Sequence, residues 1–408
     1  MNEEDFKNLL SKHNQQHLIF YYHNLNEDEQ KEFRNQIAHV NWEYIDNFKK
    51  NKFNKKRGKL KPLKALSSNE ISKNTFKYEA NGLQAIKNGQ VAAVLLAGGQ
   101  GSRLGFEGPK GAYNIGIKKD KYIFELLIEN IKSVSQQAQT YIFFYIMTSP
   151  GNYDATVKFF EDHNYFNYPK QYVTFFKQEV LPAIDFEGNL LMNSPKDLCL
   201  SPNGNGGWFD SIIKSGLLDS IQNNGIKWMN VFSVDNVLQK IADPIFIGAT
   251  IDSNCVCGAK VIKKASPQEK VGVLCLEDDK PSVVEYTEMT EEMISSYDPD
   301  GELSFRFGVI LNYLFNIEAL LNINSESFPI HLAKKKINNY NATGEYIKPE
   351  KENGYKFELL ILDMIHQLDN CLPYEVIRED EFAPVKNLVG VDSVESARYL
   401  LKNNGFKL

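Results

Sequence analysis

Apolar residues near the start of the chain recur at helical spacing. Phe6, Leu9 and Leu10 fall on one face of such a helix, and polar residues fill the gaps between them. Apolar positions three and four residues apart mark the buried face of an amphipathic helix. We therefore expect the stretch from Asp5 to about Phe48 to be helical.

The pattern changes after residue 90, where short continuous apolar runs replace the amphipathic spacing. These runs are Val91–Ala97, Tyr141–Thr148, Tyr172–Phe176 and Val231–Val234. Runs this short, bounded by turn residues, are typical of strands buried on both faces. Helical patterns lie between them, at Tyr122–Val134 and Trp208–Ile221. Alternating strands and helices predict an α/β fold with a mostly parallel, helix-covered sheet.

Extended patterns dominate further along the chain. They occupy residues 258–262, 272–276, 282–286 and 305–315. Amphipathic spacing then returns, and it predicts helices at Phe357–Leu368 and Val394–Leu401.

Composition and charge narrow the class of protein. Of the 408 residues, 42% are hydrophobic and 24% charged, as in ordinary globular proteins. The formal net charge of -6 provides no general attraction for nucleic acid or an anionic membrane. The basic run Lys49–Arg57 is therefore interpreted as a solvated linker, with a nucleic-acid arm as the alternative.

The sequence shows neither a recognisable targeting signal nor cysteines at metal-binding spacing. No apolar run is long enough to span a bilayer, and the acidic start lacks the apolar region of a signal peptide. The 5 cysteines are scattered, without a second pair at zinc-site spacing. We expect reduced thiols in a cytoplasmic protein.

The main chemical feature is a glycine-rich loop directly after the first buried run. Residues 96–105 read Leu-Ala-Gly-Gly-Gln-Gly-Ser-Arg-Leu-Gly, and residues 108–111 read Gly-Pro-Lys-Gly. Glycines let backbone N–H groups approach a ligand closely. With Arg103 and Lys110 nearby, such groups make a phosphate cradle. The alternative is a glycine turn with surface cations.

The loop fits neither of two common phosphate-binding motifs. The dinucleotide fingerprint G-x-G-x-x-G fails because Gly105 comes one residue too late. The Walker A motif fails because Lys110 follows Pro109 and precedes Gly111.

These segments and eight others, in family order, resemble the eukaryotic UDP-N-acetylglucosamine pyrophosphorylases of the UDP-sugar pyrophosphorylase family. The others lie at residues 146–149, 175–183, 202–207, 233–238, 257–261, 271–273, 283–288 and 378–387. The resemblance implies a Rossmann-like nucleotidyltransferase that makes UDP-N-acetylglucosamine and pyrophosphate from UTP and N-acetylglucosamine 1-phosphate. It also implies a helical segment (1–55), a catalytic domain (56–380) and a short C-terminal segment (381–408). The family's β-rich C-terminal domain is expected to be absent.

The resemblance assigns nucleotide binding to the glycine loop and to positions further along the chain. The residues implied are Leu96, Gly98, Gly99, Gln178 and Gly204. An amide such as that of Gln178 both donates and accepts, as the imide edge of uracil requires. Since most glutamines are exposed, a surface glutamine at a strand end is the alternative.

Sugar binding is assigned by the resemblance to Asn205, Gly272, Glu285 and Val309. A carboxylate such as that of Glu285 can accept hydrogen bonds from two hydroxyls, with a solvent-facing strand residue as the alternative. Relatives carry asparagine at the position of Val309. This departure keeps open a UDP-glucose or broad UDP-sugar pyrophosphorylase.

Catalysis is assigned to Arg103, Lys110 and Lys386. The sugar phosphate is already an anion, so these cations would offset its repulsion from the α-phosphate of UTP. Their joint presence argues against an inactive nucleotide-sugar binding protein. We expect a monomer whose partners are UTP and a sugar 1-phosphate.

A metal role is assigned to Asp235, which follows the apolar run 231–234. In an open α/β sheet, ligands bind at the carboxyl ends of the strands. A carboxylate there can hold Mg²⁺, or Mn²⁺, against phosphate oxygens. The alternative is an N-cap for a following helix.

Overall fold

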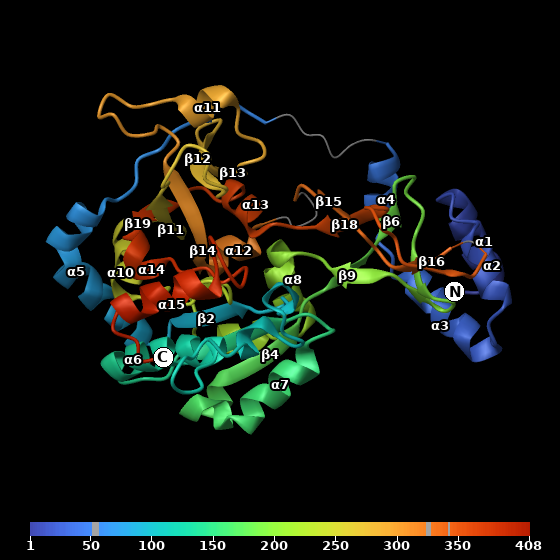
Figure 1. Ribbon diagram of the computed structural model, residues 1–408, viewed down its shortest axis with the longest axis horizontal. Helices are drawn as coiled ribbons and strands as arrows, with labels where there is room; N and C mark the ends of the chain where they lie inside the picture. The colour runs from blue at the N-terminus through green and yellow to red at the C-terminus, as the bar shows by residue number, and fades with distance from the viewer. Residues whose placement is uncertain (51–56, 324–327, 342) are drawn as a thin grey trace. The chain divides into compact units, whose positions relative to one another are not determined.

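The computed structural model describes residues 1–50, 57–323, 328–341 and 343–408. The chain forms two compact units, each built from separate stretches. The first comprises residues 1–56, 179–207 and 326–361, and the second comprises residues 57–178, 208–325 and 362–408 (Figure 1). The basic run at 49–57 lies mostly outside the described residues, so its interpretation as a linker stays a prediction.

The helical pattern at the start of the chain is confirmed as a series of short helices in the first unit. They are α1 (Glu3–Lys12), α2 (Leu18–His23), α3 (Glu27–Ala38) and α4 (Trp42–Lys49). Asparagine side chains cap α1 and α3, and at α3 Asn26 and Glu29 form a reciprocal capping box. The fully buried Phe6, Leu10 and Phe33 form the shared apolar face.

The rest of the first unit consists of short strands in small sheets. The strands are β5 (Val180–Pro182), β6 (Ile184–Asp185), β7 (Met192–Ser194), β8 (Asp197–Leu198), β9 (Leu200–Pro202), β15 (His331–Lys335), β16 (Asn339–Tyr340), β17 (Tyr346–Ile347) and β18 (Gly354–Glu358). The helix predicted at Phe357–Leu368 is wrong in its first part. Phe357 lies in β18 opposite Leu332, because pairing with β15 satisfies its backbone, and only α13 (Ile361–His366) is helical.

The second unit contains the large mixed sheet. Its path runs β1 (Leu60–Lys61), β12 (Val273–Glu277), β14 (Phe307–Asn316), β10 (Trp228–Ser233), β2 (Val91–Leu96), β3 (Phe143–Thr148) and β4 (Val173–Lys177). β11 (Cys257–Lys263), β13 (Lys280–Val284) and β19 (Leu372–Glu375) pair beside this path. β10, β2, β3 and β4 are parallel, whereas β14 is antiparallel to β10. The predicted α/β fold with a mostly parallel mixed sheet is confirmed.

Helices surround this sheet. They are α5 (Ser68–Lys87), α6 (Ile123–Ala138), α7 (Tyr153–Asp162), α8 (Trp208–Lys214), α9 (Leu218–Asn223), α10 (Pro244–Asp252), α11 (Glu291–Ser295), α12 (Ile317–Leu321), α14 (Arg378–Glu381) and α15 (Val394–Asn403). The single helix predicted at 208–221 is two helices, because Gly216 takes a left-handed conformation with φ +70° between them. In the part of the chain that the structure describes, no helix has the length and apolar character needed to cross a bilayer. All 5 cysteines are free thiols.

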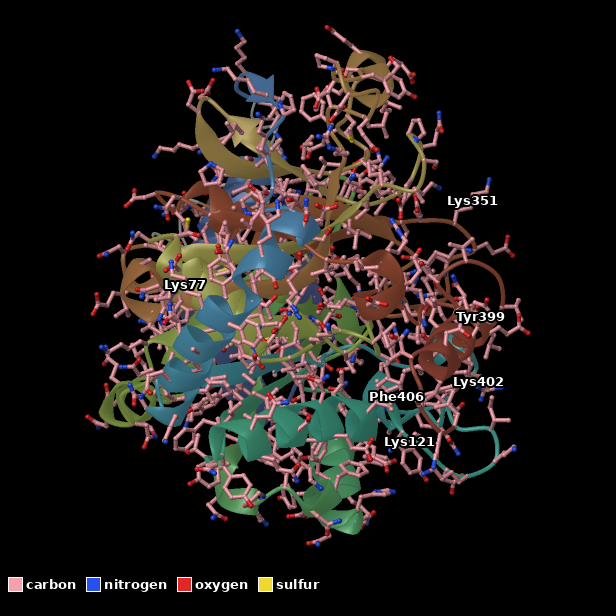
Figure 2. The ribbon with its side chains drawn as sticks, turned by 90° about the vertical axis from the view of Figure 1, so that its left-hand side faces the viewer. Lys77, Lys121, Lys351, Tyr399, Lys402 and Phe406 are labelled. Atoms are coloured by element: carbon pink, nitrogen blue, oxygen red, sulfur yellow. The ribbon has the colours of Figure 1, made fainter. Side chains whose placement is uncertain are left out.

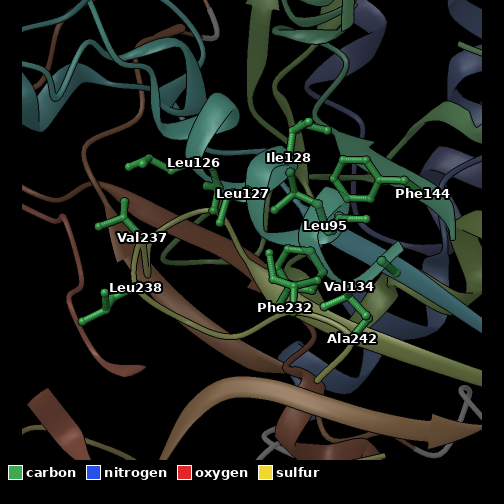
Figure 3. Close-up of a cluster of buried hydrophobic side chains, with 14 of the residues drawn as sticks. Leu95, Leu126, Leu127, Ile128, Val134, Phe144, Phe232, Val237, Leu238 and Ala242 are labelled. Atoms are coloured by element: carbon green, nitrogen blue, oxygen red, sulfur yellow. The ribbon is translucent and has the colours of Figure 1, made fainter. Parts of the chain in front are cut away.

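A continuous apolar core fixes the parallel strands against α6. Leu95, Phe144 and Phe232 come from adjacent strands and lie together, with Leu127 and Ile128 of α6 beside them (Figure 3). The Phe144 and Phe232 rings are nearly parallel, with centroids 6.4 Å apart. Side chains packed this closely resist displacement, so the ends of these strands form a rigid support.

The last helix, α15, packs on the same unit. Its Ala397 and Leu401 are buried in the core. Arg398 donates hydrogen bonds to the Ile115 carbonyl at 2.9 Å and to the Gly116 carbonyl at 3.0 Å. Figure 2 shows the side chain of Tyr399 at this end of the chain. These contacts anchor the segment that carries Lys386 from its C-terminal side.

Candidate active site

Predicted site residues of the second unit gather at one edge of its sheet. Because β10, β2, β3 and β4 are parallel, their carboxyl ends meet at that edge. The glycine loop leaves β2 there, Gln178 directly follows β4, and Asp235 follows β10. Such an edge is where open α/β sheets bind ligands.

The structure brings Gly98 and Gln178 together. A Cβ atom at Gly98 would lie 2.9 Å from Oε1 of Gln178 and 3.4 Å from the backbone nitrogen of Ser149, so only glycine fits without displacement. Gln178 is 6% exposed, and its backbone N–H donates to the Thr148 carbonyl at 2.7 Å. The alternative of a surface glutamine is therefore wrong. At Gly99 a Cβ would meet nothing within 4 Å, which leaves the backbone open to a ligand.

Two residues that sequence reasoning missed hold the glycine loop in place. The Asn152 side-chain amide donates to the Ala97 carbonyl at 3.1 Å and to the Gly99 carbonyl at 3.3 Å. The Ser149 hydroxyl donates to Oδ1 of Asn152 at 2.9 Å. Ser149 lies in a matched segment, but nothing in the sequence points to Asn152, since its loop partners are distant in the chain.

Lys110 and Asp235 form the central ion pair of the site. Lys110 Nζ lies 2.7 Å from Asp235 Oδ1, and the two side chains are 7% and 34% exposed. Burial lowers the pKa of Lys110, Asp235 opposes that effect, and the positive charges of Arg103 and Lys386 lower it further. The Lys110 backbone N–H donates to the Gly99 carbonyl at 3.2 Å, which closes the loop.

Asp235 does not cap a helix. A β-bridge at Asn236 and then bends and irregular backbone follow it as far as Asp243, throughout a described stretch, and Asp243 is the residue that caps α10. The cap alternative is therefore wrong. Among the described residues, no cluster of three or more histidine, cysteine or acidic side chains could hold a metal. Asp235 offers a single accessible carboxylate, which fits a cation that takes its other ligands from phosphate and water.

The other predicted cations lie around this pair at longer range. Lys386 Nζ is 2.9 Å from Asp392 Oδ2, and its side chain is 40% exposed. Its backbone N–H donates to the Asp392 carbonyl at 2.7 Å. Arg103 is exposed on the glycine loop. The structure therefore shows Lys386 paired with Asp392, and its effect on Lys110 is electrostatic.

Three of the predicted sugar-binding residues lie together in the second unit. A Cβ at Gly272 would lie 3.6 Å from both Oε1 of Glu285 and Cγ2 of Val309. The Val309 N–H donates to the Gly272 carbonyl at 2.9 Å. Glu285 is half-buried and lies one residue beyond the end of β13, and its role toward a sugar stays a prediction.

The strand register places this group at the same edge as Asp235. In β14, which is antiparallel to β10, Asn312 pairs with Phe232 near the carboxyl end of β10. Residue numbers in β14 decrease toward that edge. Val309, which is 9% exposed, therefore lies beyond the end of β10.

Gly204 and Asn205 belong to the first unit, where they form a tight bend. Gly204 has φ +90°, and a Cβ there would lie 2.3 Å from the Leu359 carbonyl oxygen. Oδ1 of Asn205 accepts a hydrogen bond from the Ile361 N–H at 3.0 Å. Only glycine tolerates this conformation and close approach. The amide of Asn205 has a structural partner here in addition to its predicted role.

Comparison with known proteins identifies the family. The family described as UTP–glucose-1-phosphate uridylyltransferase matches residues 25–408. The chain belongs to this family. The chain is 40% identical over 341 residues to the UDP-N-acetylglucosamine pyrophosphorylase of Saccharomyces cerevisiae, covering 80% of this chain and 71% of that protein. The resemblance to the UDP-N-acetylglucosamine pyrophosphorylases within the uridylyltransferase family is thus confirmed.

Two further relatives show how much of each similar protein this chain covers. It is 37% identical over 321 residues to UDP-N-acetylhexosamine pyrophosphorylase-like protein 1 of Mus musculus, covering 76% of this chain and 63% of that protein. The chain thus spans less than two thirds of that relative. The solved UDP-N-acetylglucosamine pyrophosphorylase of Trypanosoma brucei superposes with a TM-score of 0.83 at 28% identity, covering 98% of this chain and 84% of that one.

Proposed function

We propose that the protein makes UDP-N-acetylglucosamine and pyrophosphate from UTP and N-acetylglucosamine 1-phosphate. The observation that carries the proposal is the Lys110–Asp235 ion pair of 2.7 Å, next to the glycine loop and under the added field of Arg103 and Lys386. An excess of positive charge at an open sheet edge suits a polyanion such as a nucleoside triphosphate. The activities named for the yeast and trypanosome relatives support the same reaction.

The chemistry follows from charge. A phosphate oxygen of the sugar 1-phosphate attacks the α-phosphorus of UTP and forms a new O–P bond. The bond from that phosphorus to the oxygen bridging the β-phosphate breaks, and its electron pair leaves with pyrophosphate. The attacking oxygen is already an anion, so no general base is needed. Lys110, Arg103 and Lys386 offset the repulsion between the two anions and stabilise the leaving group.

Polar groups other than these cations would provide recognition. The buried amide of Gln178 would pair with the imide edge of uracil, beside the backbone of Gly98. Glu285 would accept hydrogen bonds from sugar hydroxyls, next to Gly272 and Val309.

Asp235 is the side chain that would hold a divalent cation, Mg²⁺ or Mn²⁺, together with phosphate oxygens. When bound there, the cation supplies charge stabilisation to the triphosphate. Lys110, which pairs with Asp235 in this structure, would then be able to turn toward the phosphates. Asp235→Asn should lose most of its activity while keeping its fold and should bind Mn²⁺ more weakly, as measured by electron paramagnetic resonance. Full activity in excess chelator would remove the metal role.

The decisive experiment measures pyrophosphate release from UTP with a panel of sugar 1-phosphates. N-acetylglucosamine 1-phosphate should be the best substrate, and ATP should not replace UTP. If no sugar 1-phosphate yields pyrophosphate, the chain is a nucleotide-sugar binding protein instead. The sequence-based expectation of a cytoplasmic monomer belongs to the same proposal.

A second candidate is a UDP-glucose or broad-specificity UDP-sugar pyrophosphorylase. The observation that favours it is Val309, whose apolar side chain lies beside Gly272 and Glu285 and offers no hydrogen bond to an acetamido group. Comparable rates with glucose 1-phosphate in the same panel would select this candidate.

A further inference from the structure

Asn236 joins two segments that carry predicted catalytic groups. Its side chain is buried, with 2% of its surface exposed. The amide nitrogen donates to the Glu381 carbonyl at 2.7 Å. The amide oxygen accepts from the Ala383 N–H at 2.9 Å and from the Leu238 N–H at 3.3 Å. One side chain thus connects the loop that follows β10 to the segment that leads to Lys386.

The backbones of these segments also pair. The Val385 N–H donates to the Asp235 carbonyl at 2.8 Å, and the Val237 N–H donates to the Ala383 carbonyl at 3.3 Å. Asn236 and Pro384 face each other as an antiparallel bridge. At this kind of position the ladder requires no N–H, so proline fits. The pairing is short, which leaves Asn236 as its main side-chain support.

Both sides of this junction are themselves anchored. On one side, the Glu381 carboxylate lies 2.6 Å from the fully buried Lys260 Nζ. On the other side, the Gln239 side chain donates to the Ser233 carbonyl at 2.7 Å and to the Asn236 carbonyl at 2.8 Å. A junction between two rigid segments sets the distance between whatever each segment carries.

Asp235 precedes Asn236 directly, and Lys386 directly follows Val385. We propose that Asn236 is a positioning residue that holds the Lys386 ammonium at the spacing from the Asp235 carboxylate needed around the triphosphate. This inference rests on the proposed uridylyl transfer. Asn236 is buried, its side-chain partners are backbone groups of this junction, and it acts by placing Lys386. A small misplacement of a charge-stabilising group has a large effect on rate, of order 10²-fold for about 1 Å.

The first test is Asn236→Ala in the full chain, with steady-state kinetics for UTP and N-acetylglucosamine 1-phosphate. We expect kcat to fall by about 10-fold to 100-fold with little change in KM for UTP, since the glycine loop and Lys110 remain to bind the nucleotide. The matched control is Asn353→Ala in the first unit. Asn353 also bridges a backbone N–H and carbonyl, those of Ile337, at 2.7 and 3.0 Å. An equal fall in kcat in that control would overturn the inference.

The second test is a double-variant cycle with Lys386→Ala. If Asn236 acts through Lys386, Asn236→Ala should add less than about 3-fold once Lys386 is gone, because coupled positions are non-additive. Effects that multiply in full would overturn the positioning role. If Asn236→Ala does not fold, Asn236→Asp replaces it, since it keeps the acceptor for Ala383 and puts a repelling carboxylate oxygen in place of the donor to the Glu381 carbonyl. A wild type without any pyrophosphate release would instead refute the proposed function.

Discussion

Two buried lysines in the second unit have similar surroundings and opposite pKa shifts. Lys260 is fully buried and lies 2.8 Å from Asp243 and 2.6 Å from Glu381, whose side chains are 8% and 6% exposed. The paired carboxylates raise the pKa of Lys260 in spite of its burial. Lys110 has one carboxylate partner, Asp235, and its pKa is lowered.

The difference lies in the balance of charge and in access to solvent. The Lys260 cluster is closed and sets two carboxylates against the Lys260 ammonium and the nearby Lys240, which lies 3.5 Å from Glu381, so its charges are satisfied within the fold. The Lys110 cluster has one carboxylate under the field of Arg103 and Lys386, and it is partly open. An unbalanced positive site gains from a polyanionic ligand, whereas a balanced one gains only stability. This contrast distinguishes the proposed phosphate site around Lys110 from the structural ion cluster around Lys260.

The largest expected effect is on stability, from Lys260→Met. The change leaves the buried Asp243 carboxylate without its ammonium partner and Glu381 with only the exposed Lys240, so the free energy of unfolding should fall by about 3–5 kcal/mol in urea denaturation. Lys240→Met is the matched control, because Lys240 lies 3.5 Å from the same Glu381 but is 57% exposed. It should change stability by less than about 0.5 kcal/mol.

The pH dependence of this cluster has a defined sign. Because the folded pKa of Lys260 is raised, its contribution is present below the ordinary value of 10.5 and is lost as pH rises through the folded value. Because the pKa of Asp243 is lowered, its contribution is present above 3.8 and is lost as pH falls. The difference between wild type and Lys260→Met should therefore be largest between these limits and shrink at both extremes.

The next effect is on catalysis, from Lys110→Ala and Lys386→Ala. Each change removes a preorganised cation, so kcat should fall by about 10²–10³-fold. Unlike Lys260→Met, Lys110→Ala should keep most of the stability, because the Asp235 left behind is partly exposed. Lys77→Ala, which removes an exposed ion pair with Asp252, should leave kcat unchanged. A rise in KM alone would limit the lysines to ground-state phosphate binding.

A smaller effect is expected on the affinity for UTP, and it distinguishes attraction by the cations from recognition of the base. The cations would attract any nucleoside triphosphate, whereas the amide of Gln178 would distinguish the base. Gln178→Ala should weaken UTP binding by about 1–3 kcal/mol in calorimetric titration, the cost of leaving a buried polar edge unpaired. Weak binding of ATP by the same variant should stay unchanged. Wild-type protein that uses ATP or CTP as well as UTP would refute the role in reading uracil.

The smallest expected effect is on the KM for the sugar 1-phosphate. It concerns Val309, the apolar residue beside Gly272 and Glu285. Val309→Asn would supply a hydrogen-bond partner worth about 0.5–1.5 kcal/mol, so KM for N-acetylglucosamine 1-phosphate should fall several-fold. The KM for UTP should stay the same. Val309→Ala adds no polar group and should bring no such gain. Loss of folding in Val309→Asn would mean that its place in β14 serves only the core, where it is 9% exposed.

Much of the fold was predictable from local pattern. The apolar run at Val91–Ala97 became β2, whose residues are all buried, and the helix predicted at Val394–Leu401 became α15. The prediction failed at Phe357, because pairing with β15 decided its conformation. Long-range pairing of this kind leaves little trace in local periodicity.

The candidate site divides in the same way. By itself, the sequence determined which residue types follow which strands: the glycine loop after β2, Gln178 after β4 and Asp235 after β10. Resemblance to a family then suggested their roles. These features depend on order along the chain and on chain direction in a parallel sheet, which a sequence carries directly.

Only the tertiary structure decided which groups meet. It paired Asp235 with Lys110, paired Lys386 with Asp392, and joined the Asp235 and Lys386 segments through Asn236. It also separated the open cluster of Lys110 from the closed cluster of Lys260. The physical reason is that burial and ion pairing depend on neighbours brought together from distant parts of the chain, and those neighbours set the charge and availability of each group.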